Sequence, residues 1–214
     1  MATTIIGLMG KKRSGKDTFA ERLVSAHGYR RVAFADPIRE ALLELNPIVS
    51  AEEWQDDLEL SNHGVDEVRL AELVDRLGWE GAKANPEVRR LLQEFGVGLR
   101  RVDNDLWLNA ALRKVDAAEG PVVITDVRFP NEFDALAARG ATMVRVVRPG
   151  TEPSDQHVSE TALDDYEPDV EIYNVRGIKE LHDEADLTRI FAEEGWETFT
   201  AILRHDESPT VHVL

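Results

Sequence analysis

The sequence predicts an α/β fold whose core is a five-stranded, parallel, doubly wound sheet. Two observations lead to this prediction. Short apolar runs alternate with segments of helical periodicity along most of the 214 residues, and a glycine-rich turn, G-K-K-R-S-G-K, separates the first strand from the first helix. Strands joined by helical crossovers lie parallel, and the ligands of such sheets bind at the carboxyl ends of the strands. We therefore expect a ligand site where these strand ends converge.

Five short apolar runs are expected to form the strands of this sheet. They cover residues 3–9, 29–35, 121–126, 141–147 and 170–173. Helices are expected at residues 17–26, 36–45, 105–118, 130–139 and 178–194, each with apolar residues on one face. The residues from Trp196 onward are compatible with either an edge strand or a loose tail.

The segment between residues 46 and 102 shows acidic and helical patterns and no convincing strand. Two apolar stripes are spaced as in helices; one consists of Val65, Val68, Leu73, Val74 and Leu77, and the other of Val88, Leu91, Leu92 and Phe95. We therefore predict a helical insertion over residues 46–102. It divides a core of residues 1–45 and 103–195, which is followed by the C-terminal segment of residues 196–214.

The composition argues against several classes of protein. The chain carries 25 basic and 41 acidic residues, a net charge of -16, whereas binding to polymeric nucleic acid depends on basic residues that neutralise phosphates. No run of about 18 apolar residues is present, so we expect no contact with a membrane. The chain has no cysteine, which excludes disulfides and cysteine-ligated zinc. The acidic net charge is still compatible with a nucleotide substrate, because the phosphates of a nucleotide need only a local basic pocket.

The turn from Gly10 to Lys16 has the features of a phosphate-binding loop. Its glycines permit a tight turn in which successive backbone N–H groups point at phosphate oxygens, and the following helix adds the positive end of its dipole. Lys16 would bridge the β- and γ-phosphates of a bound nucleotide. The alternative is a glycine-rich turn that binds nothing. It is the weaker interpretation, because both glycines, the lysine and the strand–helix context occur together.

The residue after Lys16 is Asp17, where the usual pattern has a Ser or Thr that binds magnesium. A carboxylate beside a triphosphate requires a cation between them, so Asp17 is a candidate ligand of Mg²⁺, either directly or through water. Thr18 can then donate a hydrogen bond to the α-phosphate. The alternative is that Asp17 only stabilises the first helical turn through the helix dipole. Both interpretations stay open.

Two residues that follow the strand at 121–126 are candidates for the same site. Asp126 stands in the position of a Walker B acid, where it would hold the magnesium shell or position the acceptor. An aspartate that merely caps the next turn is the alternative. Arg128 can clamp a phosphate through two parallel hydrogen bonds.

Four motifs together resemble the deoxynucleoside monophosphate kinases of tailed phages and their bacterial relatives. They are G-K-K-R-S-G-K-D-T, F-A-D-P-I-R-E, I-T-D-V-R-F-P-N-E and H-V-S-E, and they cover the chain from Ile5 to about Leu181. The resemblance implies a P-loop kinase fold that transfers the γ-phosphoryl group of ATP to a deoxynucleoside 5′-monophosphate (dNMP), with magnesium. It also implies that the insertion binds the nucleoside monophosphate, and that the G-K-D-T ending is normal for the family.

The resemblance assigns roles to individual residues. ATP would be bound by Lys12, Arg13, Ser14, Gly15, Lys16, Asp17, Thr18 and Arg148. The acceptor would be contacted by Phe34, Asp36, Ile38, Arg39, Gln93, Arg101 and Arg128. Catalysis would depend on Lys16, Arg128 and Asp126, and magnesium would be held by Asp17 and Asp126. For Arg101, a solvated position on a helix is an equal alternative, and Val97 and Gly98 stand where Thr-Glu is common in the family.

Residues 148–163 would form a lid that closes over the phosphates and excludes water from the reaction. Arg148 is the best basic residue of this lid for contact with ATP. His157 and the pair Ser159 and Glu160 are better explained by roles in local structure.

Two other functions share part of this pattern. Phosphomevalonate kinases of the animal type have a similar R-x-S-G-K-D loop, and a regulatory ATPase needs the loop without an acceptor pocket. The insertion and the lid-like segment favour a kinase over such an ATPase. We expect dNMP and ATP as binding partners and a cytoplasmic location, in the host if the gene belongs to a phage. A homodimer formed through the insertion is compatible with the sequence.

Overall fold

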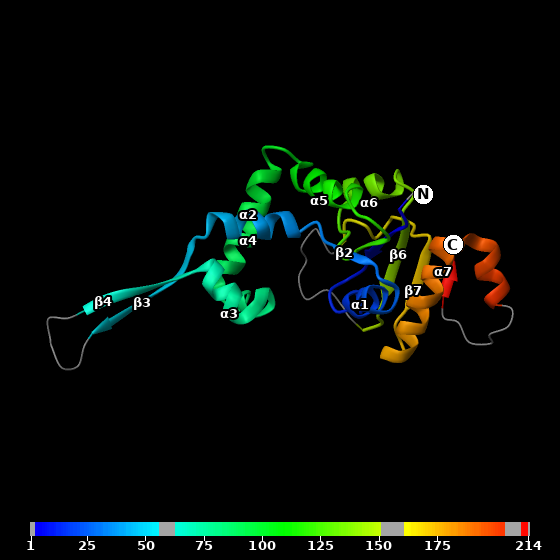
Figure 1. Cartoon of the computed structure of the whole chain (residues 1–214), viewed down its shortest axis with the longest axis horizontal. Coiled ribbons are helices and arrows are strands. Elements are labelled where there is room, and N and C mark those ends of the chain that lie inside the picture. The colour runs from blue at the N-terminus through cyan, green and yellow to red at the C-terminus, as the bar shows by residue number, and fades with distance from the viewer. Residues whose placement is uncertain (1–2, 56–62, 151–160, 204–210, 214) are drawn as a thin grey trace. The chain divides into compact units, whose positions relative to one another are not determined.

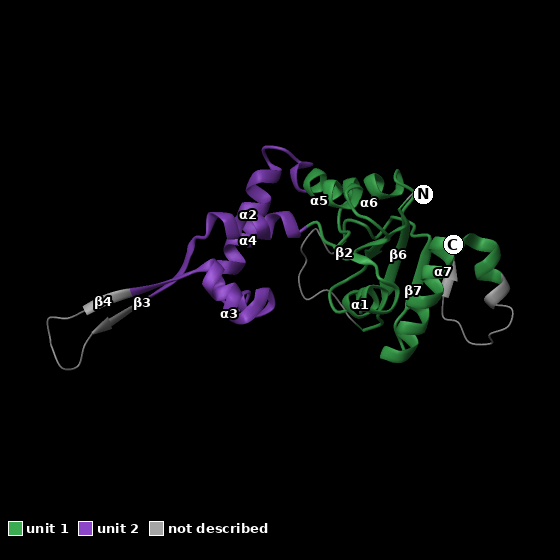
Figure 2. Cartoon of the chain, in the orientation of Figure 1, with its two compact units in different colours: residues 1–34, 108–214 green, residues 35–107 purple. Residues whose placement is uncertain are grey.

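The computed structural model describes residues 3–55, 63–150, 161–203 and 211–213. The chain forms two compact units, which Figure 2 shows in different colours. Unit 1 consists of Met1–Phe34 and Leu108–Leu214, and unit 2 consists of Ala35–Trp107.

Unit 1 is built on a six-stranded sheet with the strand order β2-β5-β1-β6-β7-β8. In chain order the strands are β1 (Ile5–Met9), β2 (Arg30–Val32), β5 (Val122–Ile124), β6 (Thr142–Val147), β7 (Val170–Tyr173) and β8 (Val211–Val213). The five strands from β2 to β7 pair in parallel, which confirms the predicted sheet. β8 pairs antiparallel with β7, so the end of the chain supplies an edge strand.

Helices cover both faces of this sheet (Figure 1). One face carries α1 (Lys16–His27) and α7 (Ile178–Leu203), and the other carries α6 (Pro130–Ala137) and the unit 1 part of α5 (Leu106–Asp116). Alternate residues of β1 point to opposite faces. Ile6 packs in one apolar cluster with Leu23 and Leu181, whereas Ile5 packs in a second cluster with Leu136. The observed ends of the helices of unit 1 lie within a few residues of the predicted ends, with one exception. α7 continues beyond its predicted end at residue 194, through a break at Gly195, where φ is 83°.

Unit 2 combines helices with a β-hairpin. Its elements are α2 (Asp36–Leu45), β3 (Ile48–Gln55), β4 (His63–Arg69), α3 (Leu70–Ala82) and α4 (Pro86–Arg100). Leu42, Leu73 and Val88 come from the three helices and are buried in one apolar cluster. Because α2 packs on this cluster, the compact unit begins at Ala35, earlier than the insertion that we predict over residues 46–102.

The prediction that residues 46–102 contain no strand is wrong, because β3 and β4 pair as an antiparallel hairpin. Val65 and Val68, which are three residues apart as in a helical stripe, both lie in β4. Acidic residues occupy several positions of both strands, and acidic residues are rare in strands, so the local pattern did not indicate them. The predicted helical stripes are confirmed from Leu70 onward, in α3 and α4.

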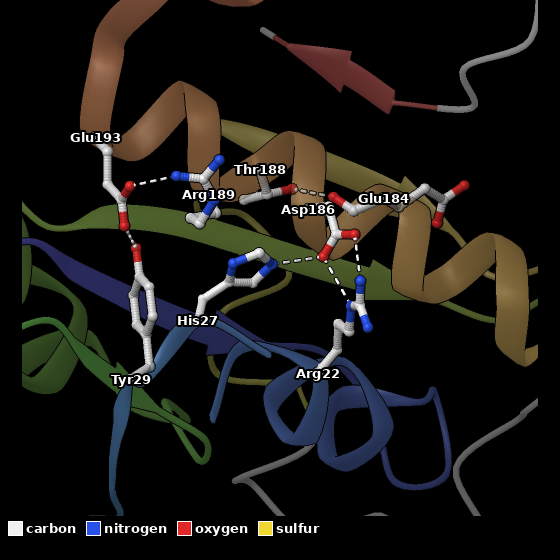
Figure 3. A network of polar contacts seen from close by, with 8 residues as sticks. All are labelled: Arg22, His27, Tyr29, Glu184, Asp186, Thr188, Arg189 and Glu193. Atoms are coloured by element: carbon white, nitrogen blue, oxygen red, sulfur yellow. Dashed lines mark hydrogen bonds and ion pairs between the residues drawn. The ribbon is translucent and has the colours of Figure 1, made fainter. Parts of the chain in front are cut away.

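A network of polar side chains joins α1 to α7 in unit 1 (Figure 3). Asp186 of α7 accepts hydrogen bonds from Nε and Nη2 of Arg22, both at 2.8 Å, and its Oδ1 lies 2.7 Å from Nε2 of His27. The hydroxyl of buried Tyr29 donates to Glu193 of α7 at 2.9 Å. The helix that follows the glycine-rich turn is therefore held to α7 by side-chain hydrogen bonds as well as by apolar packing.

Replacing Asp186 by Asn should lower the melting temperature of the protein by about 2–4 °C near neutral pH. The Arg22 guanidinium, and after it the His27 ring, lowers the pKa of Asp186 below its ordinary value of 3.8. The contribution of the carboxylate is therefore present above pH 3.8 and is lost as the pH falls through the lower folded-state pKa. The difference in melting temperature between parent and variant should shrink below about pH 4.

Thermal unfolding between about pH 7 and pH 3 checks this expectation. Glu194→Gln is the matched control, because Glu194 is an exposed acidic residue on the same helix α7, so its replacement should change little. A difference between parent and Asp186→Asn that persists unchanged at the lowest pH would contradict a role for the charge.

Candidate active site

The turn between β1 and α1 depends on two glycines with positive φ. Gly10 has a φ of 131° and Gly15 has a φ of 110°, a conformation that side chains with a Cβ rarely adopt. A Cβ at Gly10 would lie 2.3 Å from the carbonyl oxygen of Val146, and a Cβ at Gly15 would lie 2.5 Å from Nδ2 of Asn174. Two glycines at these positions therefore let the turn lie directly against the residues at the ends of β6 and β7.

Lys16 is the first residue of α1 and is 9% exposed. Its Nζ donates hydrogen bonds to the carbonyl oxygens of Gly10 at 2.6 Å and of Lys11 at 2.8 Å. The ammonium group thus lies over the turn, beside the N-terminus of α1. This is the place where the charge of a bound phosphate would be neutralised by both the ammonium and the helix dipole.

Ser14 is buried within the same turn. Its N–H donates to the carbonyl oxygen of Lys11 at 3.2 Å, but its Oγ has no hydrogen-bond partner among the described residues. Buried hydroxyl groups are normally hydrogen-bonded, and an exception calls for an explanation such as a ligand. The Ser14 hydroxyl is therefore a candidate donor to a phosphate oxygen.

A cavity of about 330 Å³ opens beside this turn, within the size range of small-molecule sites. Residues from the β1–α1 turn, the segment after β5 and the end of β6 line it. Of the predicted site residues, Ser14, Arg128 and Arg148 lie in its wall. The predicted ATP-binding turn and these two arginines therefore meet at the carboxyl edge of the sheet.

Arg145 also lines this cavity, and the sequence analysis did not identify it. Its guanidinium donates to the carbonyl oxygen of Leu163 at 2.8 Å and to that of Tyr166, and it lies 3.6 Å from the carboxylate of Glu171. An arginine in the middle of a strand belongs to no motif, so no local signal indicates it. Because its guanidinium binds these protein groups, Arg145 supports the structure of the cavity wall.

Asp126 and Arg128 lie in the segment that follows β5. The Oδ1 of Asp126 accepts a hydrogen bond from the N–H of Phe34 at 2.7 Å, which links the segments that follow β2 and β5. The side chain of Phe34 is buried in the apolar cluster that contains Leu136. The N–H groups of Arg128 and Phe129 donate to the buried carboxylate of Glu132, at 2.8 and 3.1 Å, which fixes the turn before α6.

The predicted magnesium ligands do not form a protein metal site by themselves. The part of the chain that the structure describes contains no group of three or more His, Asp or Glu side chains that could hold a metal ion. Asp17 is exposed on the first turn of α1, and Asp126 is half-buried. Magnesium in kinases is commonly bound by one or two carboxylates together with substrate phosphates and water, and these two residues fit that kind of site.

The predicted acceptor residues of unit 2 fall in two places. On α2, Nη1 of Arg39 lies 3.4 Å from the carboxylate of Asp36, and its guanidinium lies 5.7 Å from the ring centroid of Trp79. Ile38 contacts Gly96 of α4. Gln93 and Arg101 are exposed and line a shallow hollow along α4 and its end.

Trp79 was not identified from the sequence. It follows a break in α3 at Gly78, where φ is 65°, and the ring then packs against the apolar cluster of unit 2 and beside Arg39. Of the predicted lid, residues 151–160 lie outside the described residues, and so do His157, Ser159 and Glu160.

These features define a class of protein. A glycine-rich turn between a buried parallel strand and a helix, with a lysine that lies over the turn, is the phosphate-binding loop of P-loop nucleotide-binding proteins. The family model of deoxynucleotide monophosphate kinase matches residues 4–69 and 75–185. The chain belongs to this family, as the resemblance of its motifs implied.

Viral and phage proteins are among its relatives. One relative is a protein of Acanthamoeba polyphaga mimivirus that is provisionally named deoxynucleotide monophosphate kinase. It is 32% identical over 195 residues, which cover 83% of this chain and 92% of the relative. The deoxynucleotide monophosphate kinase of Enterobacteria phage T4 is 27% identical over 228 residues, which cover 83% of this chain and 95% of the relative. The deoxynucleotide monophosphate kinase of Escherichia phage RB69 is 36% identical over 101 residues, which cover 44% of this chain and 41% of the relative.

Replacing Ser14 by Ala should leave the melting temperature of the protein without nucleotide unchanged or slightly higher. A buried hydroxyl without a partner costs about 1–3 kcal/mol of desolvation, and the variant no longer bears this cost. The rise in melting temperature on addition of ATP should become smaller, because a donor to the phosphate is lost.

Thr188→Val is the matched control for this experiment, since the buried Thr188 hydroxyl donates to the carbonyl oxygen of Glu184 at 2.8 Å. It should lower the melting temperature and leave the ATP-dependent rise unchanged. If Ser14→Ala behaves like Thr188→Val, the Ser14 hydroxyl has a structural and not a ligand-binding role.

Proposed function

We propose that this protein transfers the γ-phosphoryl group of ATP to a deoxynucleoside 5′-monophosphate, which yields ADP and a deoxynucleoside diphosphate. The observation that carries the proposal is the β1–α1 turn with Lys16 lying over it, in a chain that belongs to the deoxynucleotide monophosphate kinase family. The phage and viral origin of the named relatives supports a role in the supply of DNA precursors.

In this reaction an oxygen of the acceptor phosphate forms a bond to the γ-phosphorus of ATP. The bond between that phosphorus and the β–γ bridging oxygen breaks, and ADP leaves with the bonding electrons. No general base is required, because the acceptor phosphate is already ionised near neutral pH. The protein therefore acts by aligning the two substrates and by neutralising their charge.

The donor is bound in unit 1. The N–H groups of the β1–α1 turn and the hydroxyl of Ser14 would hold the β-phosphate, while Lys16 follows the charge of the transferred group. Arg128 and Arg148, which line the cavity beside the turn, would contact the phosphates. Thr18 would donate to the α-phosphate.

Asp17 and Asp126 are the residues that would hold magnesium. When bound, the ion would neutralise the charge that develops on the phosphate oxygens during transfer. Asp126 is kept in place for this role by its hydrogen bond from the N–H of Phe34.

The acceptor is bound by residues that lie mainly in unit 2. Arg39 is a ligand for the acceptor phosphate, and the carboxylate of Asp36 and the ring of Trp79 restrain its guanidinium. Ile38, Gln93 and Arg101 would contact the rest of the nucleotide. The role of Phe34 is less direct, because its side chain is buried in the core of unit 1 and its N–H binds Asp126.

The remaining expectations concern the surroundings of the enzyme. In the described part of the chain, no helix has the length and apolar character needed to cross a membrane. A cytoplasmic location, the absence of polymeric nucleic acid from the partners and a homodimer formed through the insertion over residues 46–102 all stay predictions.

Replacing Lys16 by Ala should reduce kcat by about a thousandfold or more, because the ammonium neutralises charge in the transition state. The melting temperature and the circular dichroism spectrum should show that the fold is kept. ADP release is measured with deoxy- and ribonucleoside monophosphates and with phosphomevalonate as acceptors.

Lys179→Ala, at an exposed lysine of α7, is the control and should retain full activity. Undiminished turnover by Lys16→Ala would contradict the proposal. ADP release with phosphomevalonate alone would assign a different acceptor.

Replacing Asp17 by Asn should raise the magnesium concentration required for half-maximal activity by about tenfold or more, if the carboxylate is a ligand. Titrations of activity with magnesium at saturating ATP measure this change. Glu21→Gln, at an exposed position one turn further along α1, should leave the requirement unaltered. An unaltered requirement in Asp17→Asn would assign Asp17 to the helix dipole instead.

A further inference from the structure

Asn174 stands immediately after β7 and contacts the phosphate-binding loop, although it is 160 residues away in the sequence. Its backbone N–H donates to the carbonyl oxygen of Val147 at 2.8 Å, which holds it at the carboxyl edge of β6. Its side-chain Nδ2 donates to the carbonyl oxygen of Ser14, also at 2.8 Å. Asn174 is thus fixed to the sheet by its backbone and to the loop by its side chain.

The contact with Gly15 is close. A Cβ at Gly15 would lie 2.5 Å from Nδ2 of Asn174 and 3.1 Å from Cδ2 of Leu181. The amide and the leucine therefore form a wall against which the last residue of the loop lies. The loop cannot move toward this wall without a clash, and the hydrogen bond opposes movement away from it.

The hydrogen bond to Ser14 also sets the orientation of one peptide group. In a planar trans peptide the C=O of one residue and the N–H of the next point in opposite directions. Because the Ser14 carbonyl points to Asn174, the Gly15 N–H must point away from it. Gly15 precedes Lys16, so this N–H is one of the donors at the start of α1 that a bound phosphate uses.

We propose that Asn174 is a positioning residue that fixes the Ser14–Gly15 peptide so that its N–H faces the phosphates of ATP. This inference rests on the proposed function, in which the loop binds ATP. Asn174 itself does not contact the nucleotide phosphates in this account. Its loss should weaken ATP binding and transfer, but should not affect binding of the acceptor.

Two variants test the proposal. Asn174→Ala removes the donor, and Asn174→Asp replaces the donor by a carboxylate oxygen that repels the Ser14 carbonyl, so that the peptide turns. Each should raise the Kd for ATP and the KM for ATP by about tenfold, with the larger effect in Asn174→Asp, and leave the KM for the dNMP unchanged.

The control is Asp186→Asn, which loosens the attachment of α1 to α7 at Arg22 and His27, near the far end of α1 from the loop. It should lower the melting temperature and leave both KM values unchanged. If the Asn174 variants also only lower the melting temperature, Asn174 has a structural role and the inference is wrong.

The Kd of ATP for each variant, measured by calorimetry without an acceptor, separates this inference from the proposed function. A parent protein that binds ATP but phosphorylates no dNMP contradicts the proposed function, while the Asn174 variants still decide the inference through their Kd. Unaltered Kd values in both variants contradict the inference alone. A parent protein that does not bind ATP contradicts both.

Discussion

The phosphate-binding loop of this protein can form only because Gly10 and Gly15 carry no side chain. A Cβ at either position would collide with a group at the carboxyl end of β6 or β7, and both residues have a positive φ that disfavours other amino acids. The shape of the loop is therefore set by two strands that are distant in sequence. The position of Lys16 follows from this shape, since its ammonium binds the carbonyl oxygens of the loop itself.

The rest of unit 1 supports that arrangement from both sides. Apolar clusters on the two faces hold β1 in the sheet, and α7 is attached to α1 through Asp186. Asn174, which follows β7, donates a hydrogen bond to the loop. In the proposed function, ATP binding depends on the contacts that Asn174 and Leu181 make with the loop, although neither residue belongs to one of the four motifs. The proposed acceptor residues lie mainly in unit 2, where the guanidinium of Arg39 lies beside the ring of Trp79. The proposed phosphoryl transfer requires both sets of contacts.

Much of the fold and the loop could be predicted because their signals are local. The apolar runs of β1, β6 and β7 and the G-K-K-R-S-G-K turn are visible in short stretches of sequence. The hairpin β3–β4 was missed because its acidic strands are defined by pairing with each other and not by composition. Asn174 and Trp79 were missed for a related reason, since each acts through a contact with a residue far along the chain. The role of Asp17 could not be decided from the sequence, because an exposed carboxylate on the first helical turn suits both magnesium and the helix dipole.

The central claim is that the protein moves the γ-phosphoryl group of ATP to the phosphate of a dNMP. The most direct test is to incubate the protein with magnesium, a dNMP and ATP that carries radioactive phosphorus only in the γ-position, and to separate the products by chromatography. We predict that the label appears in the deoxynucleoside diphosphate. Label that appears only in inorganic phosphate, or stays in ATP with every dNMP, would contradict the account.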